Sequence, residues 1–371
     1  MAELKEALRS KTYAPSPVKR VRIPKGDGSE RLLGIPTIRN RVAQMAVKLV
    51  IEPIFEADFC DTSYGFRPKR SAHDAVDDAS YALNCGYTTV IDADVSKYFD
   101  TIPHAKLLAV LAERIADRSI LHLIWMWLKA PVREEDEEGR GRNRGGGKRN
   151  TQGTPQGGVI SPLLANLYLH ILDRIWQRRQ LQRKLQARLV RYADDCIVLC
   201  RRGTEQPMLI VRHVMERLGL TLNDTKTRIV DTRQESFTFL GFELRVGRSK
   251  RTGKTYPHVQ PSKKSLQRIK DRITELTQRR KTRLPLPVVM GNVNEALRGW
   301  VGYFHHGNCA QTLLHLRGHV EQRMRTHLCK RHKVRSRGAG YRMYPNRSLY
   351  EKYGLYKVPT TAGWTQAHAL R

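Results

Sequence analysis

The sequence predicts an α+β protein in which strands and helices alternate over the first two thirds of the chain, followed by helices alone. The β-like run 88–95 precedes a helix with Leu107, Leu108 and Leu111 on one side, an order typical of layered α and β structure. A Gly- and Arg-rich stretch over 133–151 predicts a surface loop. After the β-rich stretch 237–246, apolar residues recur at helical spacing from Leu266 to Leu328, which predicts a small helical domain.

Charge indicates the class of partner. The 371 residues include 67 Lys and Arg against 35 Asp and Glu, a net charge of +32, so we expect a polyanion and above all nucleic acid. From 241 to 371 there are 28 Lys and Arg against 6 Asp and Glu, which makes the last third the main binding region. We find no apolar run of membrane-spanning length and no signal at the amino terminus, so we expect no membrane partner and a cytoplasmic location.

The cysteines predict neither a disulfide framework nor a zinc ribbon. The six of them are scattered without a CxxC pair, which is typical of reduced, buried thiols. A zinc site remains an alternative near the carboxyl terminus, but its spacings do not fit a standard finger. The residues concerned are Cys309, His315, His319, Cys329 and His332.

Three acids suggest a metal site. Asp194 and Asp195 stand between the apolar runs 189–190 and 196–200, which read as the arms of a β-hairpin. Asp94 ends the β-like run 88–95. Carboxylates on neighbouring strands can hold two Mg²⁺ ions about 3.5–4 Å apart, the geometry of two-metal catalysis. The alternative is a set of unrelated surface acids.

Eight ordered blocks carry a family resemblance. They lie at 23–36, 63–68, 94–100, 153–162, 192–195, 222–227, 239–242 and 297–304, and include Tyr-Ala-Asp-Asp at 192–195 and Leu-Arg-Gly-Trp-Val-Gly-Tyr-Phe at 297–304. In this order the blocks resemble those of group II intron-encoded reverse transcriptases and maturases, from about Lys11 to nearly the end of the chain.

The resemblance implies a right-hand polymerase fold. We expect fingers over 1–90, a palm with the catalytic carboxylates over 91–247, an all-helical thumb or maturase (X) domain over 260–332, and a basic Tyr-rich tail over 333–371. The tyrosines of that tail can stack on unpaired bases or pack onto the helical domain, and the sequence leaves both open.

The resemblance also implies an RNA-directed DNA polymerase and assigns residues to it. Asp94, Asp194 and Asp195 would bind two Mg²⁺ ions, with Mn²⁺ as a substitute. Phe99 would be the steric gate against a 2′-hydroxyl, although it also reads as a core aromatic. The incoming nucleotide would be bound by Phe99 together with Lys25, Arg31 and Gln156.

The partners expected from the resemblance are a template or intron RNA, a DNA or RNA primer, and deoxynucleotides. Weaker candidates for nucleic-acid binding are Arg67, Lys226, Arg298 and Tyr303. The alternatives are a maturase that acts mainly as an RNA-binding splicing cofactor, and a host-adopted defence reverse transcriptase. No His-Asn-His endonuclease pattern follows the helical region, so we expect no second-strand cleavage.

Overall fold

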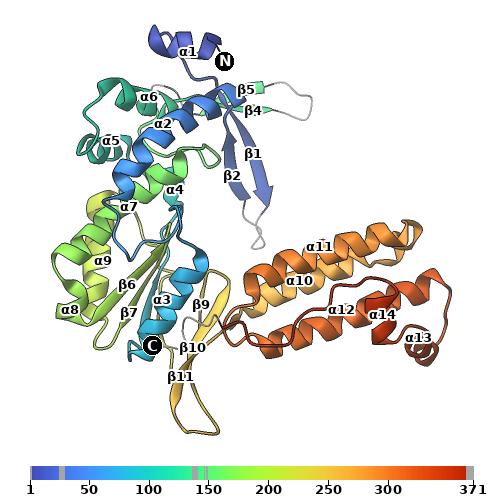
Figure 1. Ribbon diagram of the computed structural model, residues 1–371. Helices are drawn as coiled ribbons and strands as arrows, with labels where there is room; N and C mark the ends of the chain where they lie inside the picture. Colours follow the sequence, from blue (N-terminus) through green and yellow to red (C-terminus); the bar gives the residue numbers. More distant parts are fainter. Residues whose placement is uncertain (1, 25–29, 136–140, 146, 148, 365–371) are drawn as a thin grey trace. The chain divides into compact units, whose positions relative to one another are not determined.

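A computed structural model of the chain describes residues 2–24, 30–135, 141–145, 147 and 149–364 (Figure 1). Its backbone divides into two compact units. Unit 1 comprises Met1–Ala82 and Gly86–Val230, and unit 2 comprises Leu83–Cys85 and Asp231–Arg371. Strands and helices alternate in unit 1, and only helices follow the strands of unit 2, so the α+β prediction is confirmed.

The first part of unit 1 contains a four-stranded sheet, here called sheet I, with the order β2-β1-β4-β5. Its strands are β1 (Val18–Pro24), β2 (Glu30–Ile35), β4 (Val132–Glu135) and β5 (Gly141–Gly145). The last two lie where composition predicted a surface loop, so that prediction was wrong for their residues. The helices of this part are α1 (Ala2–Arg9), α2 (Ile38–Glu56), α3 (Ala72–Asn84) and α6 (Arg118–Leu128).

The second part of unit 1 contains sheet II, with the order β6-β7-β3-β8. Its strands are β3 (Thr89–Ala93), β6 (Ala187–Tyr192), β7 (Asp195–Cys200) and β8 (Arg228–Asp231), and β3 and β6 both run antiparallel to β7. The helices are α4 (Tyr98–Thr101), α5 (His104–Ala112), α7 (Ser161–Arg178), α8 (Leu181–Leu185) and α9 (Glu205–Leu218).

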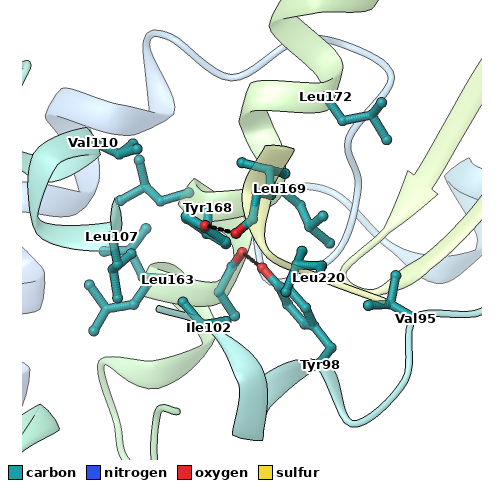
Figure 2. Close-up of a cluster of buried hydrophobic side chains, with 14 of the residues drawn as sticks. Val95, Tyr98, Ile102, Leu107, Val110, Leu163, Tyr168, Leu169, Leu172 and Leu220 are labelled. Carbon is teal, nitrogen blue, oxygen red and sulfur yellow. Dashed lines mark hydrogen bonds between the residues drawn. The ribbon is translucent and has the colours of Figure 1, made fainter. Parts of the chain in front are cut away.

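The core of unit 1 joins sheet II to α5 and α7. Figure 2 shows Tyr98 and Tyr168 among aliphatic side chains of this core. The hydroxyl of Tyr98 donates to the carbonyl oxygen of Ala165, and that of Tyr168 donates to the carbonyl oxygen of Leu218. Each buried phenol therefore has a hydrogen-bond partner, and the short helix α4 is held against α7.

Unit 2 combines a three-stranded sheet, sheet III, with helices. Sheet III has the order β11-β10-β9, formed by β9 (Phe237–Phe239), β10 (Phe242–Arg248) and β11 (Thr255–Pro261). The helices are α10 (Lys263–Leu276), the 3₁₀ helix η1 (Arg279–Arg283), α11 (Leu286–Phe304), α12 (Ala310–Arg331), α13 (Arg337–Met343) and α14 (Asn346–Glu351). Sheet III lies within the range predicted for the palm or just beyond it, yet its residues group with the helices.

Aromatic side chains join sheet III to α11. The ring of Phe242 contacts Tyr303, Phe304 and His306, with centroids 5.2–5.8 Å apart.

Among the described residues, none of the helices combines the length and the apolar character that crossing a membrane demands.

Candidate active site

Two strands of sheet II meet at the predicted acidic turn. The register of β6 and β7 runs from Ala187↔Cys200 to Tyr192↔Asp195, which leaves only Ala193 and Asp194 to cross between the strands. Ala193 has a φ of 57°, in the left-handed region. That conformation costs a residue with a side chain about 1–2 kcal/mol, so the turn depends on support from its surroundings.

Asp94 lies beside this turn. The last pair between β3 and β7 is Ala93↔Cys196, so Asp94 follows β3 at the end where Asp195 begins β7. The Asp94 carbonyl oxygen accepts a hydrogen bond of 2.8 Å from the backbone N–H of Asn223. The backbone of Asp94 is thus fixed by a second loop, and the exposed side chain of Lys226 belongs to that same loop.

The carboxylates crowd one another. One side of Asp195 reaches solvent, but burial of the rest, together with the charges of Asp194, Asp92 and Asp94, raises the pKa of Asp195 to about 6. Burial also raises the pKa of Asp194, against the opposing effect of Arg31. The cluster therefore holds more negative charge than its surroundings neutralise.

Asp92 is an acid of this cluster that the sequence analysis missed. Burial, reinforced by Asp94 and opposed by Arg228, raises the pKa of Asp92 to about 6. The signal was present in the sequence, because residues two apart on a strand face the same side. Asp92 lies on β3 and Asp94 directly after it, two positions further along the chain.

Whether a metal ion can bind here depends on the carboxylate oxygens of these acids. Within the described ranges, no group of three or more His, Cys, Asp or Glu side chains is arranged closely enough to hold a metal ion as it stands. Asp94, Asp194 and Asp195 nevertheless interact electrostatically, and carboxylate oxygens are the ligands that Mg²⁺ prefers. A divalent cation would offset the burial and the mutual repulsion that raise the pKa values of Asp194 and Asp195.

Two residues predicted to bind nucleotide contact each other. Arg31 of β2 donates from Nε to Oε1 of Gln156 over 2.9 Å. The backbone N–H of Gly34 donates to the carbonyl oxygen of Gln156 over 2.6 Å, so both ends of Gln156 are bound to β2. Arg31 also acts on the pKa of Asp194, which links this pair to the acidic turn. Lys25, the other predicted cation, lies outside the described residues.

Glycines allow this close approach. A Cβ at Gly157, whose φ is 115°, would lie 2.9 Å from the carbonyl oxygen of Gly34. A Cβ at Gly34 would lie 2.9 Å from Cγ1 of Val18. Any side chain at either position would push the loop of Gln156 away from β2.

Phe99 is attached to the same loop. Its carbonyl oxygen accepts a hydrogen bond of 2.7 Å from the N–H of Thr154, two residues before Gln156. The Phe99 side chain is buried, and its ring meets Tyr98 edge-on at 5.6 Å. Its side chain therefore packs in the core, and its backbone holds the loop that carries Gln156.

A buried arginine braces the acidic turn. Arg191, at 0% exposure, donates to both carboxylate oxygens of Asp173 and to Oδ1 of Asn166 over 2.7 Å. It also donates to Oγ of Ser63 over 2.6 Å and to the carbonyl oxygen of Ala193 over 3.0 Å. This support could not be predicted, because nothing in the sequence pattern pairs Arg191 with α7.

The segment before α3 closes over the same turn. A Cβ at Gly65 would lie 2.3 Å from the backbone nitrogen of Ala193. The carbonyl oxygen of Gly65 accepts a hydrogen bond of 2.9 Å from Asn166, which also contacts Arg191. The block at 63–68 thus supports the acidic turn from outside the sheet.

Arg67, a predicted nucleic-acid contact, is committed to the protein interior. Its guanidinium donates to the Glu56 carboxylate over 2.7 and 3.1 Å and to the carbonyl oxygens of Cys60 and Ser63 over 2.7 and 2.8 Å. It also lies over the ring of Phe59. The Arg67 guanidinium is therefore occupied by contacts within the protein.

Arg298 and Tyr303, the predicted contacts on α11, differ in availability. Arg298 is exposed and lies over the ring of Tyr356, 5.7 Å from its centroid. The hydroxyl of Tyr303 donates to the carbonyl oxygen of Leu240 over 3.0 Å. Tyr303 thus supports the 239–242 segment, whereas Arg298 can still reach solvent.

The residues of the zinc alternative form no metal-binding group among the described residues. The Cys309 thiol donates to the carbonyl oxygen of Thr361, and His319 contacts that of Lys270 over 3.2 Å. Most tail tyrosines are also packed: Tyr344, Tyr350, Tyr353 and Tyr356 belong to the core of unit 2 or lie against it.

Comparisons with known proteins agree with this arrangement. Residues 23–244 match the family model of reverse transcriptase (RNA-dependent DNA polymerase), and residues 266–344 match the model of the group II intron maturase-specific domain. The chain is 36% identical over 277 residues to protein YkfC of Escherichia coli, covering 65% of this chain and 70% of that protein.

A second curated relative is the group II intron-encoded protein LtrA of Lactococcus lactis, 29% identical over 314 residues, which cover 67% of this chain and 51% of LtrA. Among solved structures, telomerase from Candida albicans aligns with 90% of this chain and 64% of its own, at 12% identity and a TM-score of 0.49. Because the polymerase model matches more than half of its residues, the chain belongs to the reverse transcriptase family, in the group II intron type that carries a maturase-specific domain.

Proposed function

We propose that this chain is an RNA-directed DNA polymerase that extends a DNA or RNA primer on an RNA template. The observation that carries the proposal is the placement of Asp94 beside the two-residue turn of Asp194, where the acids share one electrostatic field. In the reaction, the primer 3′-hydroxyl attacks the α-phosphate of a deoxynucleotide and pyrophosphate leaves.

Asp94, Asp194 and Asp195 would hold two Mg²⁺ ions, with Mn²⁺ as a substitute. When bound, such ions supply stabilisation of the attacking oxygen and of the charge that develops on the leaving pyrophosphate. The protein contributes position, because the carboxylates stand on paired strands and the turn is braced by Arg191.

Arg31, Gln156 and Phe99 would form the nucleotide side of the site. The Arg31 guanidinium can offset charge on the triphosphate, since its hydrogen bond to Gln156 leaves other N–H groups available. Lys25 is proposed for the same role. Phe99 would exclude a 2′-hydroxyl by its bulk, which favours deoxynucleotides.

The test of catalysis is a double variant, Asp194→Asn with Asp195→Asn. We expect incorporation on an RNA template to fall at least a thousandfold, with Glu216→Gln, an exposed acid on α9, as the matched control. Mg²⁺ should also raise the melting temperature of the wild type and not that of the double variant. Equal incorporation by the double variant and the wild type would refute the proposal.

A second function, RNA binding in support of intron splicing, is favoured by the maturase-specific match at 266–344. Exposed Arg279, Arg280 and Arg283 lie in or beside η1 within that range. If the chain is a maturase, changing all three to Glu should abolish splicing of its intron RNA, whereas the Asp194, Asp195 double variant should still support it. Splicing by the charge-reversed variant at the wild-type level would contradict this role for η1.

A further inference from the structure

The β10–β11 hairpin extends beyond sheet III. β10 pairs with β11 over seven positions, from Phe242↔Pro261 to Arg248↔Thr255. β9 covers β10 only from Phe242 to Leu244. Beyond Leu244, β10 pairs as a strand with β11, and the N–H of Val246 also donates to the carbonyl oxygen of Thr232 over 2.8 Å. The end of the hairpin projects from the rest of unit 2 (Figure 1).

The outer part of this hairpin, called here the basic tip (residues 245–254), carries unpaired positive charge. Its five cations, Arg245, Arg248, Lys250, Arg251 and Lys254, are all exposed, and the segment contains no Asp or Glu. None of the ion pairs in the described part of the chain involves them. Arg114, Arg174 and Arg272, by contrast, each bind a carboxylate.

The basic tip is ordered by its own hydrogen bonds. The N–H of Ser249 donates to the carbonyl oxygen of Lys254 over 2.9 Å, and that of Gly253 donates to Ser249 over 2.8 Å. Nε of Arg248 donates to the carbonyl oxygen of Gly253 over 3.0 Å. The backbone thus presents the cations in a fixed arrangement, which lowers the entropy lost on binding.

The nearest aromatic side chains on β11, Tyr256 and His258, pack against neighbouring residues of the hairpin and against each other. A Cβ at Gly247 would lie 3.0–3.3 Å from ring atoms of Tyr256, so this ring covers Gly247, and it meets His258 edge-on at 5.9 Å. Burial, with help from Arg245, lowers the pKa of His258. Residues 245–254 themselves contain no aromatic side chain, so the tip offers charge without a ring of its own on which an unpaired base could stack.

We infer that the basic tip binds the phosphate backbone of double-helical RNA. A ribbon that carries guanidinium and ammonium groups and no stacking platform suits a helix whose bases are hidden, and Arg binds phosphate through two N–H groups. Strand rise spreads these charges over roughly 15–20 Å, enough for several phosphates. RNA is chosen over DNA because unit 2 also holds the maturase-specific match, so the inference rests on the proposed function.

The test uses the full chain and a blunt RNA duplex of about 20 base pairs with blocked 3′ ends. The tip variant changes Arg245, Lys250, Arg251 and Lys254 to Gln and keeps Arg248, whose Nε bonds the turn. The control variant removes four other exposed cations, Arg178, Arg179, Arg183 and Lys184. The dissociation constant is measured from 50 to 200 mM KCl.

We expect the tip variant to lower the slope of log affinity against log salt by about 3, and to weaken duplex binding roughly tenfold to hundredfold. The control variant should change the slope by less than 1. Melting temperatures within about 2 °C of wild type establish that both variants fold.

Three results would overturn the inference: equal losses in both variants, an equal loss on single-stranded RNA of the same length, or an equal loss on duplex DNA. Primer extension by the wild type is measured separately from duplex binding. If extension fails while the tip effect persists, the polymerase proposal is wrong and the duplex-binding surface stands.

Discussion

The molecule contains two β-hairpins that are supported in opposite ways. The β6–β7 turn rests on a fully buried arginine neutralised by Asp173 and is covered by Gly65. The basic tip of β10–β11 has exposed cations that form no ion pair with the described residues, and no described atom lies within 4 Å of where a Cβ at Gly253 would stand. Reacting atoms require fixed geometry, whereas a surface that binds a polyanion requires free charge. The following predictions test this contrast.

The largest effect is expected at the brace. Arg191→Met leaves the Asp173 carboxylate buried without its ion partner, which should cost about 3–5 kcal/mol of unfolding free energy. Urea unfolding measures the loss. The double variant Arg191→Met, Asp173→Leu should recover most of it, because no buried charge remains. A loss below 1 kcal/mol in the single variant would contradict the role of the ion pair.

The double variant also separates support of the turn from support of the fold. It should refold but lack the hydrogen bond from Arg191 to the Ala193 carbonyl oxygen. We expect kcat for nucleotide incorporation to fall while KM stays near the wild-type value. A change in KM alone would mean that the brace serves binding.

The next effect is expected from a single methyl group beneath the turn. Gly65→Ala places Cβ against the backbone of Ala193, and a displacement of about 1 Å at reacting groups can cost on the order of a hundredfold in rate. In Gly253→Ala the new Cβ has free space, so only the left-handed φ of 68° should matter, at about 1–2 kcal/mol of stability. Single-turnover incorporation and thermal melting compare the two variants, and equal losses of rate would remove the contrast.

Low pH should weaken the ion pair between Arg191 and Asp173 and leave the charge of the basic tip unchanged. Burial alone would raise the pKa of Asp173, but Arg191 and His170 hold it below its ordinary value. The ionised carboxylate therefore stabilises the folded chain above about pH 4, and this contribution is lost as the pH falls further. Unfolding free energy should drop more steeply below pH 4 in wild type than in the Arg191, Asp173 double variant. Parallel curves would show that the pair does not titrate.

The smallest effect is expected at the tip. Arg251→Gln should change unfolding free energy by no more than about 0.5 kcal/mol, because the side chain is exposed and forms no ion pair among the described residues. The slope of log affinity for duplex RNA against log salt should still fall by about 0.7–0.9 in this variant. Denaturation and salt titration of the same preparation test both statements, and a stability loss above 1 kcal/mol would mean that the tip is structural.

Much of sheet II could be predicted from local pattern. Continuous apolar and β-like runs placed the strands that flank Asp94 and Asp194, and acids on neighbouring strands were expected to lie together. The family resemblance supplied Arg31 and Gln156, which the structure brings into contact. The helical character of the last third followed from residue spacing alone.

Tertiary partners could not be predicted in this way. Arg191 and Arg67 look like the other arginines of a basic chain, and only the folded structure places Asp173 and Glu56 beside them. The strands β4 and β5 were missed because a Gly- and Arg-rich stretch shows no alternation of apolar and polar residues. The residues that hold the acidic turn in place were thus harder to predict than the acids themselves.

The hydrogen bond between Arg31 and Gln156 has a consequence for engineering. Arg31 donates to the side chain of Gln156, and a Cβ added at Gly34 or Gly157 would lie only 2.9 Å from a neighbouring atom. Changes at these four positions should therefore be strongly epistatic, so that single-site scans misjudge what pairs tolerate. A library intended to alter nucleotide choice should vary positions 31 and 156 together and leave both glycines untouched.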